Sequence, residues 1–194
     1  MKSYNTFVFA RVLMAAMALF STPTLALPAG LSKVSFSELT GEKVMKNGIY
    51  TLTYDKAGIP SISHTPLDMN LTTRATEHRN EQSIGARAAG CDNIALDHHN
   101  TDTALSNLEN TCSGGKFGTT WAVADFVVAF YCQWNRQAVC TRQSALEAVK
   151  WVAEACGAYA AGSYSGDGYA YGFTDYQKHD FCNIVLESSG PCPA

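Results

Sequence analysis

The sequence predicts an α+β domain, a two-layer sandwich in which two helices pack on one face of a mainly antiparallel sheet that is stapled by disulfides. Three observations support this fold class. Two segments place apolar residues at helical spacing, and the segments around them are alternating or continuously apolar, as strands are. All seven cysteines lie beyond residue 90, which fits a small domain held together by cross-links.

Residues 1–26 have the features of a secretory signal peptide. Lys2 and Arg11 provide a basic start, residues 12–20 are apolar, and Thr24 and Ala26 are small residues at the −3 and −1 positions of a cut after Ala26. The apolar run is too short for a membrane anchor, because crossing a bilayer takes about 20 apolar residues. We therefore expect an exported, extracellular protein with no membrane span.

Residues 27–74 contain no cysteine, and a polar linker follows at 75–90. One hairpin is predicted here, because Asn47-Gly48 is a turn signal and residues 49–54 alternate like a half-buried strand. Leu71-Thr72-Thr73-Arg74 resembles the Leu-x-x-Arg processing motif of some fungal secreted precursors, so Arg74 is a candidate cleavage site. Residues 27–74 are then a removable pro-segment. The alternative is an N-terminal extension that stays in the final fold.

The cysteine-rich domain is predicted to span residues 91–194 and to contain two helices. The first covers 102–112 after the capping residues Asn100 and Thr101, and its apolar face consists of Ala104, Leu105, Leu108 and Cys112. The second follows the cap Thr141 and ends before Gly157. Its apolar stripe consists of Leu146, Val149, Val152, Ala153 and Cys156.

The remaining segments of this domain are predicted strands. Trp121 to Trp134 is the most apolar stretch of the chain, and residues 126–132 within it predict a central strand buried on both faces. Residues 158–164 and 169–173 predict a hairpin around the turn Asp167-Gly168. Residues 181–186 predict a last strand, so the order is helix, strand, helix, hairpin, strand.

The cysteines are expected to form disulfides, because an exported chain meets an oxidising compartment. Six are expected to pair, namely Cys91, Cys112, Cys132, Cys140, Cys156 and Cys182. A bridge between Cys112 and Cys156 is one candidate, since each ends a predicted helix. Cys192 is left over, as a free thiol or as the link of a disulfide-bonded dimer. Asn70 is the one glycosylation sequon.

Charge and cysteine spacing argue against several partners and cofactors. The formal charge is −3, and it becomes −5 when Lys2 and Arg11 leave with the signal peptide. Binding of nucleic acid or anionic membrane needs clustered Lys and Arg, which this sequence lacks. No Cys-x-x-Cys pair suggests a zinc site. We therefore expect no cofactor and no metal.

Motifs with catalytic associations are few. Asp97-His98-His99 resembles the Asp-His-His signature of manganese phosphoesterases, but it stands just before a helix cap and reads better as a polar loop. His179-Asp180 is predicted to lie in a surface turn. A secreted ribonuclease would need a His/Glu/Arg group, for which the chain offers His179, Glu187, Arg136 and Arg142. No catalytic residue is assigned, and whether the protein is an enzyme stays open.

Aromatic residues of the predicted hairpin offer a candidate binding face, because tyrosine-rich surfaces are common at interfaces. The candidates are Tyr159, Tyr164, Tyr169, Tyr171 and Phe173. The alternative is that one face packs under the helices. The intervening Gly and Ala residues favour this alternative for Tyr169, Tyr171 and Phe173.

The cysteine-rich part shares its element order and residue pairs with a known group of proteins. The pairs are Gly90-Cys91, Cys112, Tyr131-Cys132, Cys156-Gly157 with Tyr159 and Gly162, Tyr171-Gly172, and Phe181-Cys182. Over about residues 90–182 this arrangement is similar to killer-toxin-like effectors, fungal secreted proteins with disulfide-rich α/β sandwich folds.

The resemblance implies a non-enzymatic effector or toxin that binds a host or competitor protein or a cell-wall component. Two alternatives remain, a small secreted hydrolase (ribonuclease or glycan hydrolase) and an antimicrobial killer-type protein.

Overall fold

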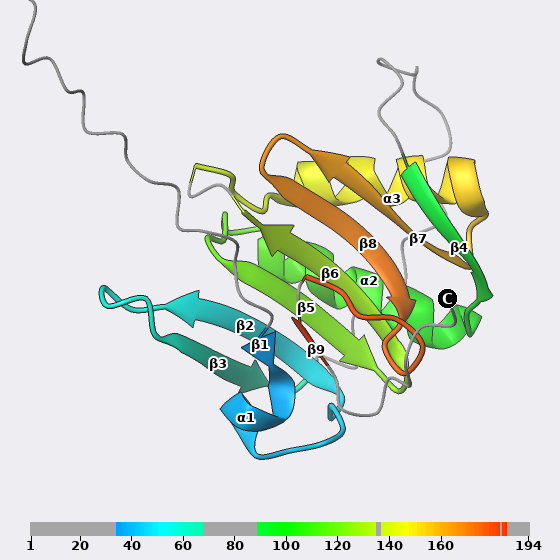
Figure 1. The fold of residues 1–194 in the computed structure, drawn as a ribbon. Coiled ribbons are helices and arrows are strands. Elements are labelled where there is room, and N and C mark those ends of the chain that lie inside the picture. Colours follow the sequence, from blue (N-terminus) through cyan, green and yellow to red (C-terminus); the bar gives the residue numbers. More distant parts are fainter. Residues whose placement is uncertain (1–33, 68–88, 135–136, 183, 186–194) are drawn as a thin grey trace, which may run out of the picture. The chain divides into compact units, whose positions relative to one another are not determined.

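The computed structural model describes residues 34–67, 89–134, 137–182 and 184–185. The strands are β1 (Val34–Ser35), β2 (Gly48–Tyr54), β3 (Pro60–Thr65), β4 (Ala89–Ala95), β5 (Thr119–Ala124), β6 (Val127–Gln133), β7 (Ala160–Gly166), β8 (Tyr169–Asp175) and β9 (Ile184–Val185). The helices are α1 (Phe36–Thr40), α2 (His98–Cys112) and α3 (Arg142–Cys156). Seven strands form one antiparallel sheet in the order β3-β2-β5-β6-β8-β7-β4 (Figure 1). The predicted α+β class is confirmed.

The two long helices form where the sequence predicts them, with one shifted start. Helix α3 begins after Thr141, whose hydroxyl accepts from the Ser144 backbone amide in a capping box, and ends at Gly157. Helix α2 begins at His98, one turn before the predicted start. The Asp97 carboxylate accepts from the Asn100 amide at 2.9 Å, so Asp97 is the cap instead of Asn100 or Thr101.

The most apolar stretch contains two strands and not one. Strand β6 lies in the middle of the sheet, as predicted for residues 126–132. Strand β5 was not predicted, because the turn between β5 and β6 contains no Gly or Pro. The chain reverses at Asp125, which takes a positive φ of 53° and donates its amide to Asn47 Oδ1 at 2.7 Å.

Two other predicted strand assignments need correction, and one further strand was not predicted. Asn47-Gly48 leads into β2 instead of joining two strands, and the hairpin turn lies between β2 and β3, where Gly58 has a φ of 80°. Ala89–Ala95 forms the edge strand β4, although its Gly, Asp and Asn residues favour a loop. Within the last predicted strand, Ile184–Val185 forms β9, which pairs in parallel with β1 outside the main sheet.

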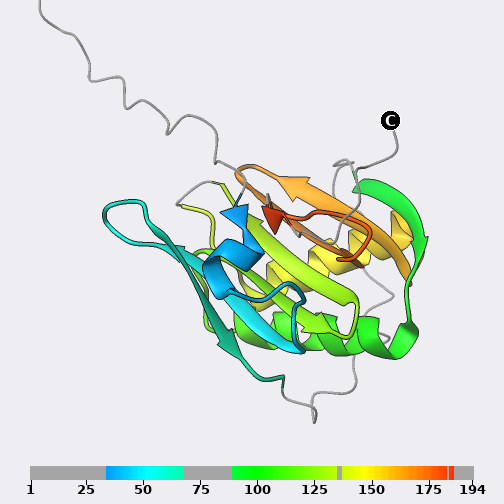
Figure 2. The same cartoon turned by 60° about the horizontal axis from the view of Figure 1, so that its bottom comes forward.

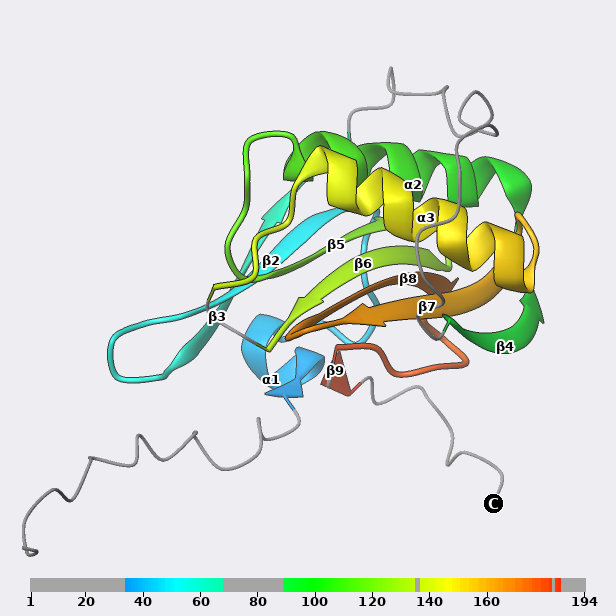
Figure 3. The same ribbon diagram turned by 90° about the horizontal axis from the view of Figure 1, so that it is seen from above.

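Both faces of the sheet carry buried apolar residues. Helices α2 and α3 contact one another and lie over one face (Figure 3), where the cluster includes Leu105, Leu108, Tyr131, Val152 and Phe173. On the other face lies a second cluster with α1 and β9 over it (Figure 2), which includes Phe36, Tyr50, Trp121, Phe130 and Ile184. Alternate residues of the central strands β5 and β6 therefore enter different cores.

Three disulfides pair the six predicted cysteines as Cys91–Cys156, Cys112–Cys140 and Cys132–Cys182. The suggested Cys112–Cys156 bridge is wrong. The end of α2 meets the start of α3 through Cys140, so the two helices run in opposite directions and their C-termini lie apart. Cys156 at the end of α3 instead meets Cys91 on the edge strand β4.

Candidate functional site

The tyrosine-rich hairpin does not present its aromatic side chains as an exposed binding face. Tyr164, Tyr171 and Phe173 are buried, and Tyr169 is half-buried against the helix-side core. The Tyr171 hydroxyl bonds Ser144 Oγ of α3 at 2.7 Å, and burial raises the pKa of Tyr171 to about 12. These rings are therefore packing residues under the helices, and Tyr159 is half-buried like Tyr169.

The Asp97-His98-His99 motif has a local structural role. Asp97 caps α2, and the His98 ring stacks on Tyr159 with 3.8 Å between ring centroids. The Tyr159 hydroxyl in turn donates to Asp102 Oδ2 at 3.4 Å. In the described part of the chain, no three His, Cys, Asp or Glu residues are placed to hold a metal ion.

The other proposed catalytic residues are not brought into one cluster by any described contact. His179 lies in the turn after β8, where its backbone amide donates to Asp175 O at 3.1 Å. Arg142 is the first residue of α3. Ala26, Asn70, Arg74, Arg136, Glu187 and Cys192 lie outside the described residues.

A hollow beside the start of α2 is lined by three carboxylates, Asp97, Asp125 and Asp175. Two of them already have partners. Asp97 accepts from the Asn100 amide, and Asp175 accepts from the Gln177 amide and forms an ion pair with Lys178 at 3.1 Å. Asp97 and Asp175 therefore have structural roles in the hollow, one in a helix cap and the other in a turn.

Exposed aromatic and aliphatic side chains gather at one end of the sheet, and we call this set the aromatic rim. Its members and exposed fractions are Tyr54 (44%), Ile59 (62%), Phe117 (64%) and Trp134 (45%). Leu52 pairs with Thr119, and Thr120 pairs with Tyr131, so the end of β2, the start of β5 and the end of β6 meet here. Figure 1 shows the tip of the β2–β3 hairpin and these strand ends on the same side of the sheet.

Hydrogen bonds fix the backbone that carries Phe117 and Trp134. Gln133 Oε1 accepts from the Gly118 amide at 2.6 Å, and the Gln133 amide donates to Thr119 Oγ1 at 3.0 Å. The Trp134 amide donates to Gly168 O of the β7–β8 turn at 2.8 Å. These bonds fix the backbone of the two residues at the sheet end, and both side chains are exposed.

The neighbouring loops are fixed as well. Lys116 exchanges two backbone hydrogen bonds of 2.9 Å with Cys140, whose sulfur is bonded to Cys112. At the hairpin tip, Asp55 Oδ1 accepts from the amides of Ala57 and Ile59, both at 2.8 Å. The rim is therefore pre-organised, which lowers the entropy lost when a surface binds.

Formal charges of both signs lie beside the rim among the described residues. Lys56 and Lys116 are exposed beside it, and the exposed Asp55 and Asp167 lie in the adjoining turns. In this described part the rim is a surface of rings and aliphatic side chains bordered by two lysines and two aspartates, and apolar contact would contribute to what it binds.

Sequence reasoning missed the rim. The only signals were Phe117, an aromatic residue in a Gly- and Lys-containing loop, and Trp134 at the end of an apolar stretch. Neither signal indicates that the two residues meet.

Comparison with protein-family models, curated proteins and solved structures found no match for this chain. Among the described residues, no helix is both long and apolar enough to cross a membrane.

Proposed function

We propose that this chain is a secreted effector or toxin-like protein, similar to killer-toxin-like effectors, that acts by binding a host or competitor target through the aromatic rim. The observation that carries the proposal is the rim itself, four large apolar side chains with exposed fractions of 44% or more at one sheet end. Its target is a protein or a cell-wall component.

Exposed apolar side chains that cluster mark interaction sites more often than scattered ones do. Tyr and Trp are enriched at interfaces because each combines a large ring with a polar group, and aromatic anchors dominate binding energies. Tyr54 and Trp134 have this character, and Phe117 adds an apolar ring. The bonds made by Gln133 fix the backbone beside Phe117 and Trp134.

Export fits the covalent structure of the domain. The three disulfides are typical of extracellular proteins, which meet an oxidising compartment. We further propose that the protein is exported as a precursor and that residues 1–26 are removed by a cut after Ala26. We further propose that the sheet and the helices α2 and α3 form the two layers of the domain.

The binding role is preferred to hydrolysis because residues of the Asp97-His98-His99 motif serve local structure. His98 stacks on Tyr159, and the Asp97 carboxylate caps α2. An antimicrobial killer-type protein would use the same rim on a competing cell, so the choice of target separates it from a host-directed effector.

The test compares binding of fluorescently labelled wild type with the variant Phe117→Ser/Trp134→Ser. The probes are intact microbial cells and plant cell-wall fractions. The matched control Val44→Ser/Phe126→Ser removes two other exposed apolar side chains, with exposed fractions of 54% and 44%, away from the rim. We expect the rim variant to lose about tenfold or more in affinity, as losing interface anchors does, and the control to bind like wild type.

Equal binding by the two variants would contradict the rim as the binding site. Cell death in infiltrated plant tissue, as opposed to growth inhibition of microbes, identifies the target class. Hydrolysis of RNA or glycan by purified wild type would replace the binding proposal with the enzymatic one.

A further inference from the structure

The N-terminal part of the fold is held to the rest without any cross-link. Residues 27–90 contain no cysteine. All three disulfides lie within residues 91–182. Residues 34–67, which form β1, α1, β2 and β3, therefore have one covalent connection to the cysteine-rich part, the chain between 67 and 89.

This N-terminal segment nevertheless supplies two strands at one edge of the sheet, β3 and β2. Strand β2 pairs with β5 over five residue pairs, from Gly48 with Val123 to Leu52 with Thr119. The Tyr50 ring stacks on Trp121 with 5.5 Å between centroids and 8° between planes. Strand addition of this kind supplies a row of backbone hydrogen bonds together with side-chain contacts.

The apolar side chains of the segment are buried against the cysteine-rich part. Phe36, Met45, Tyr50 and Leu52 belong to the same cluster as Trp121, Val123, Val128, Phe130 and Ile184. All four are buried, and Phe36 is completely inaccessible to solvent. Burial of four such side chains provides a large driving force for staying bound.

Hydrogen bonds outside the strand ladder also cross between the two parts. Thr120 Oγ1 donates to Tyr50 O at 2.9 Å, and the Asp125 amide donates to Asn47 Oδ1 at 2.7 Å. The Tyr176 hydroxyl donates to Met45 O at 3.3 Å. Asp125, the residue with a positive φ in the β5–β6 turn, is therefore the residue to which the Asn47 side chain is bonded.

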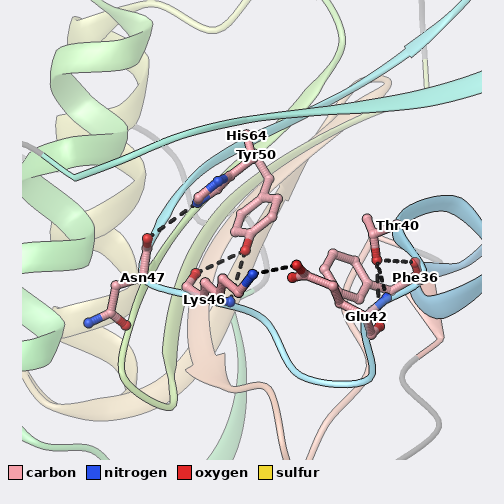
Figure 4. A network of polar contacts seen from close by, with 7 residues as sticks. All are labelled: Phe36, Thr40, Glu42, Lys46, Asn47, Tyr50 and His64. Carbon is pink, nitrogen blue, oxygen red and sulfur yellow. Dashed lines mark hydrogen bonds and ion pairs between the residues drawn. The ribbon is translucent and has the colours of Figure 1, made fainter.

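The segment also has internal order that shapes it for this contact (Figure 4). The Tyr50 hydroxyl accepts from the Lys46 amide at 2.9 Å and donates to Lys46 O at 3.0 Å. His64 of β3 bonds Asn47 O at 3.3 Å, and its ring packs on Tyr50. The loop before β2 and the outer strand β3 therefore brace Tyr50 against Trp121.

Loss of the segment would uncover buried apolar side chains and one strand edge of the cysteine-rich part. Trp121 and Val123 are both completely buried, and Trp121 would lose the Tyr50 ring that stacks on it while Val123 would lose its strand partner Gly48. Strand β5 would become an open edge with unpaired backbone groups, which favours aggregation.

We propose that residues 34–67 remain bound as a non-covalent subunit when the chain is cut between 67 and 89, including after Arg74. Processing would then yield a two-chain protein, in which the N-terminal chain supplies β2 and β3 of the sheet. This inference does not depend on the aromatic rim as a binding site, although Tyr54 and Ile59 of the rim lie on the N-terminal chain.

The test uses the full-length secreted protein with its disulfides intact. The recognition sequence of a site-specific protease replaces residues after Arg74, and the purified protein is cut to completion. Size-exclusion chromatography is run at about 10 μM, where an interface of standard size stays assembled. We expect both fragments in one peak in equal amounts, while a non-reducing denaturing gel shows two chains.

A buried and an exposed residue of β2 provide the matched variants. Leu52→Ser removes a buried contact and should weaken retention of the N-terminal fragment about tenfold or more, since core truncations of this size cost several kcal/mol. Tyr54→Ser changes an exposed residue of the same strand and should retain the fragment like wild type. If Leu52→Ser is not secreted, Leu52→Ala takes its place.

Two results would overturn the inference. One is separate elution of the N-terminal fragment from cut wild type while the cysteine-rich fragment keeps its far-UV circular dichroism. The other is equal retention in the Leu52 and Tyr54 variants, because retention would then not come from the β2–β5 contact.

Discussion

Glu109 is a buried carboxyl group that should make the stability of this protein depend on pH. It lies on α2 with 9% of its surface exposed. Burial raises the pKa of Glu109 from 4.5 to about 7, and the charge of Arg142 partly opposes this shift. In the folded state the carboxyl group therefore keeps its proton at pH values where the unfolded chain has lost it.

The sign and size of the effect follow from this shift. Between pH 4.5 and 7 the folded state binds more protons than the unfolded state, so the free energy of unfolding falls as pH rises. A change from 4.5 to about 7 corresponds to a loss of about 3 kcal/mol. That is a substantial share of the 5–15 kcal/mol typical of domains.

The substitution Glu109→Gln removes this titration while keeping the shape of the side chain. We expect urea unfolding to give similar free energies for wild type and Glu109→Gln near pH 4.5. Above pH 8 the variant should be more stable by about 3 kcal/mol. All other groups titrate in both proteins, so their contributions cancel in the difference.

Two further variants test the cause. Glu147→Gln removes an exposed carboxylate of α3 and serves as the matched control. Arg142→Gln removes the charge that lowers the pKa of Glu109, so loss of stability should extend to higher pH than in wild type. A difference between wild type and Glu109→Gln that is the same at pH 4.5 and pH 8 would refute the reasoning.

Two other substitutions test how the fold is held together. Gly172→Ala should lower the free energy of unfolding by about 1–3 kcal/mol, because the added Cβ would lie 2.5 Å from Phe130 Cζ. The control Gly114→Ala adds a Cβ in open space, so the same urea titration should show a much smaller change in the free energy of unfolding. Cys91→Ser/Cys156→Ser opens a cross-link between residues 65 apart and should cost about 4 kcal/mol on the chain-entropy model. A midpoint of thermal unfolding within about 2 °C of wild type would contradict that estimate.

Local signals predicted the helices well because the physics that starts and ends a helix is local. Thr141 and Gly157 lie within one turn of the backbone groups they satisfy, so the bounds of α3 could be read from the sequence. The start of α2 was misplaced because Asp97, Asn100 and Thr101 are all good capping residues. The choice among them falls to Asp97, whose carboxylate reaches the Asn100 amide.

Contacts between distant segments were not predictable in the same way. Composition indicated that the cysteines pair, but the partner of Cys112 depends on the opposite directions of α2 and α3. The β5–β6 turn was hidden because Asp125 adopts a positive φ beside Asn47, 78 residues earlier in the chain. No window of sequence around Asp125 contains that information.

The aromatic residues show the same limit at the candidate site. Tyr171 and Phe173 sit on an alternating strand, and that pattern alone fits both an exposed face and a core. Phe117 and Trp134 are exposed because β5 begins and β6 ends at a sheet end that no element covers in the described structure. Exposure of an aromatic ring is thus a property of the pairing register. A one-residue slip of β5 against β6 would turn the side chains of β5 to the opposite face of the sheet while leaving the composition of every strand unchanged.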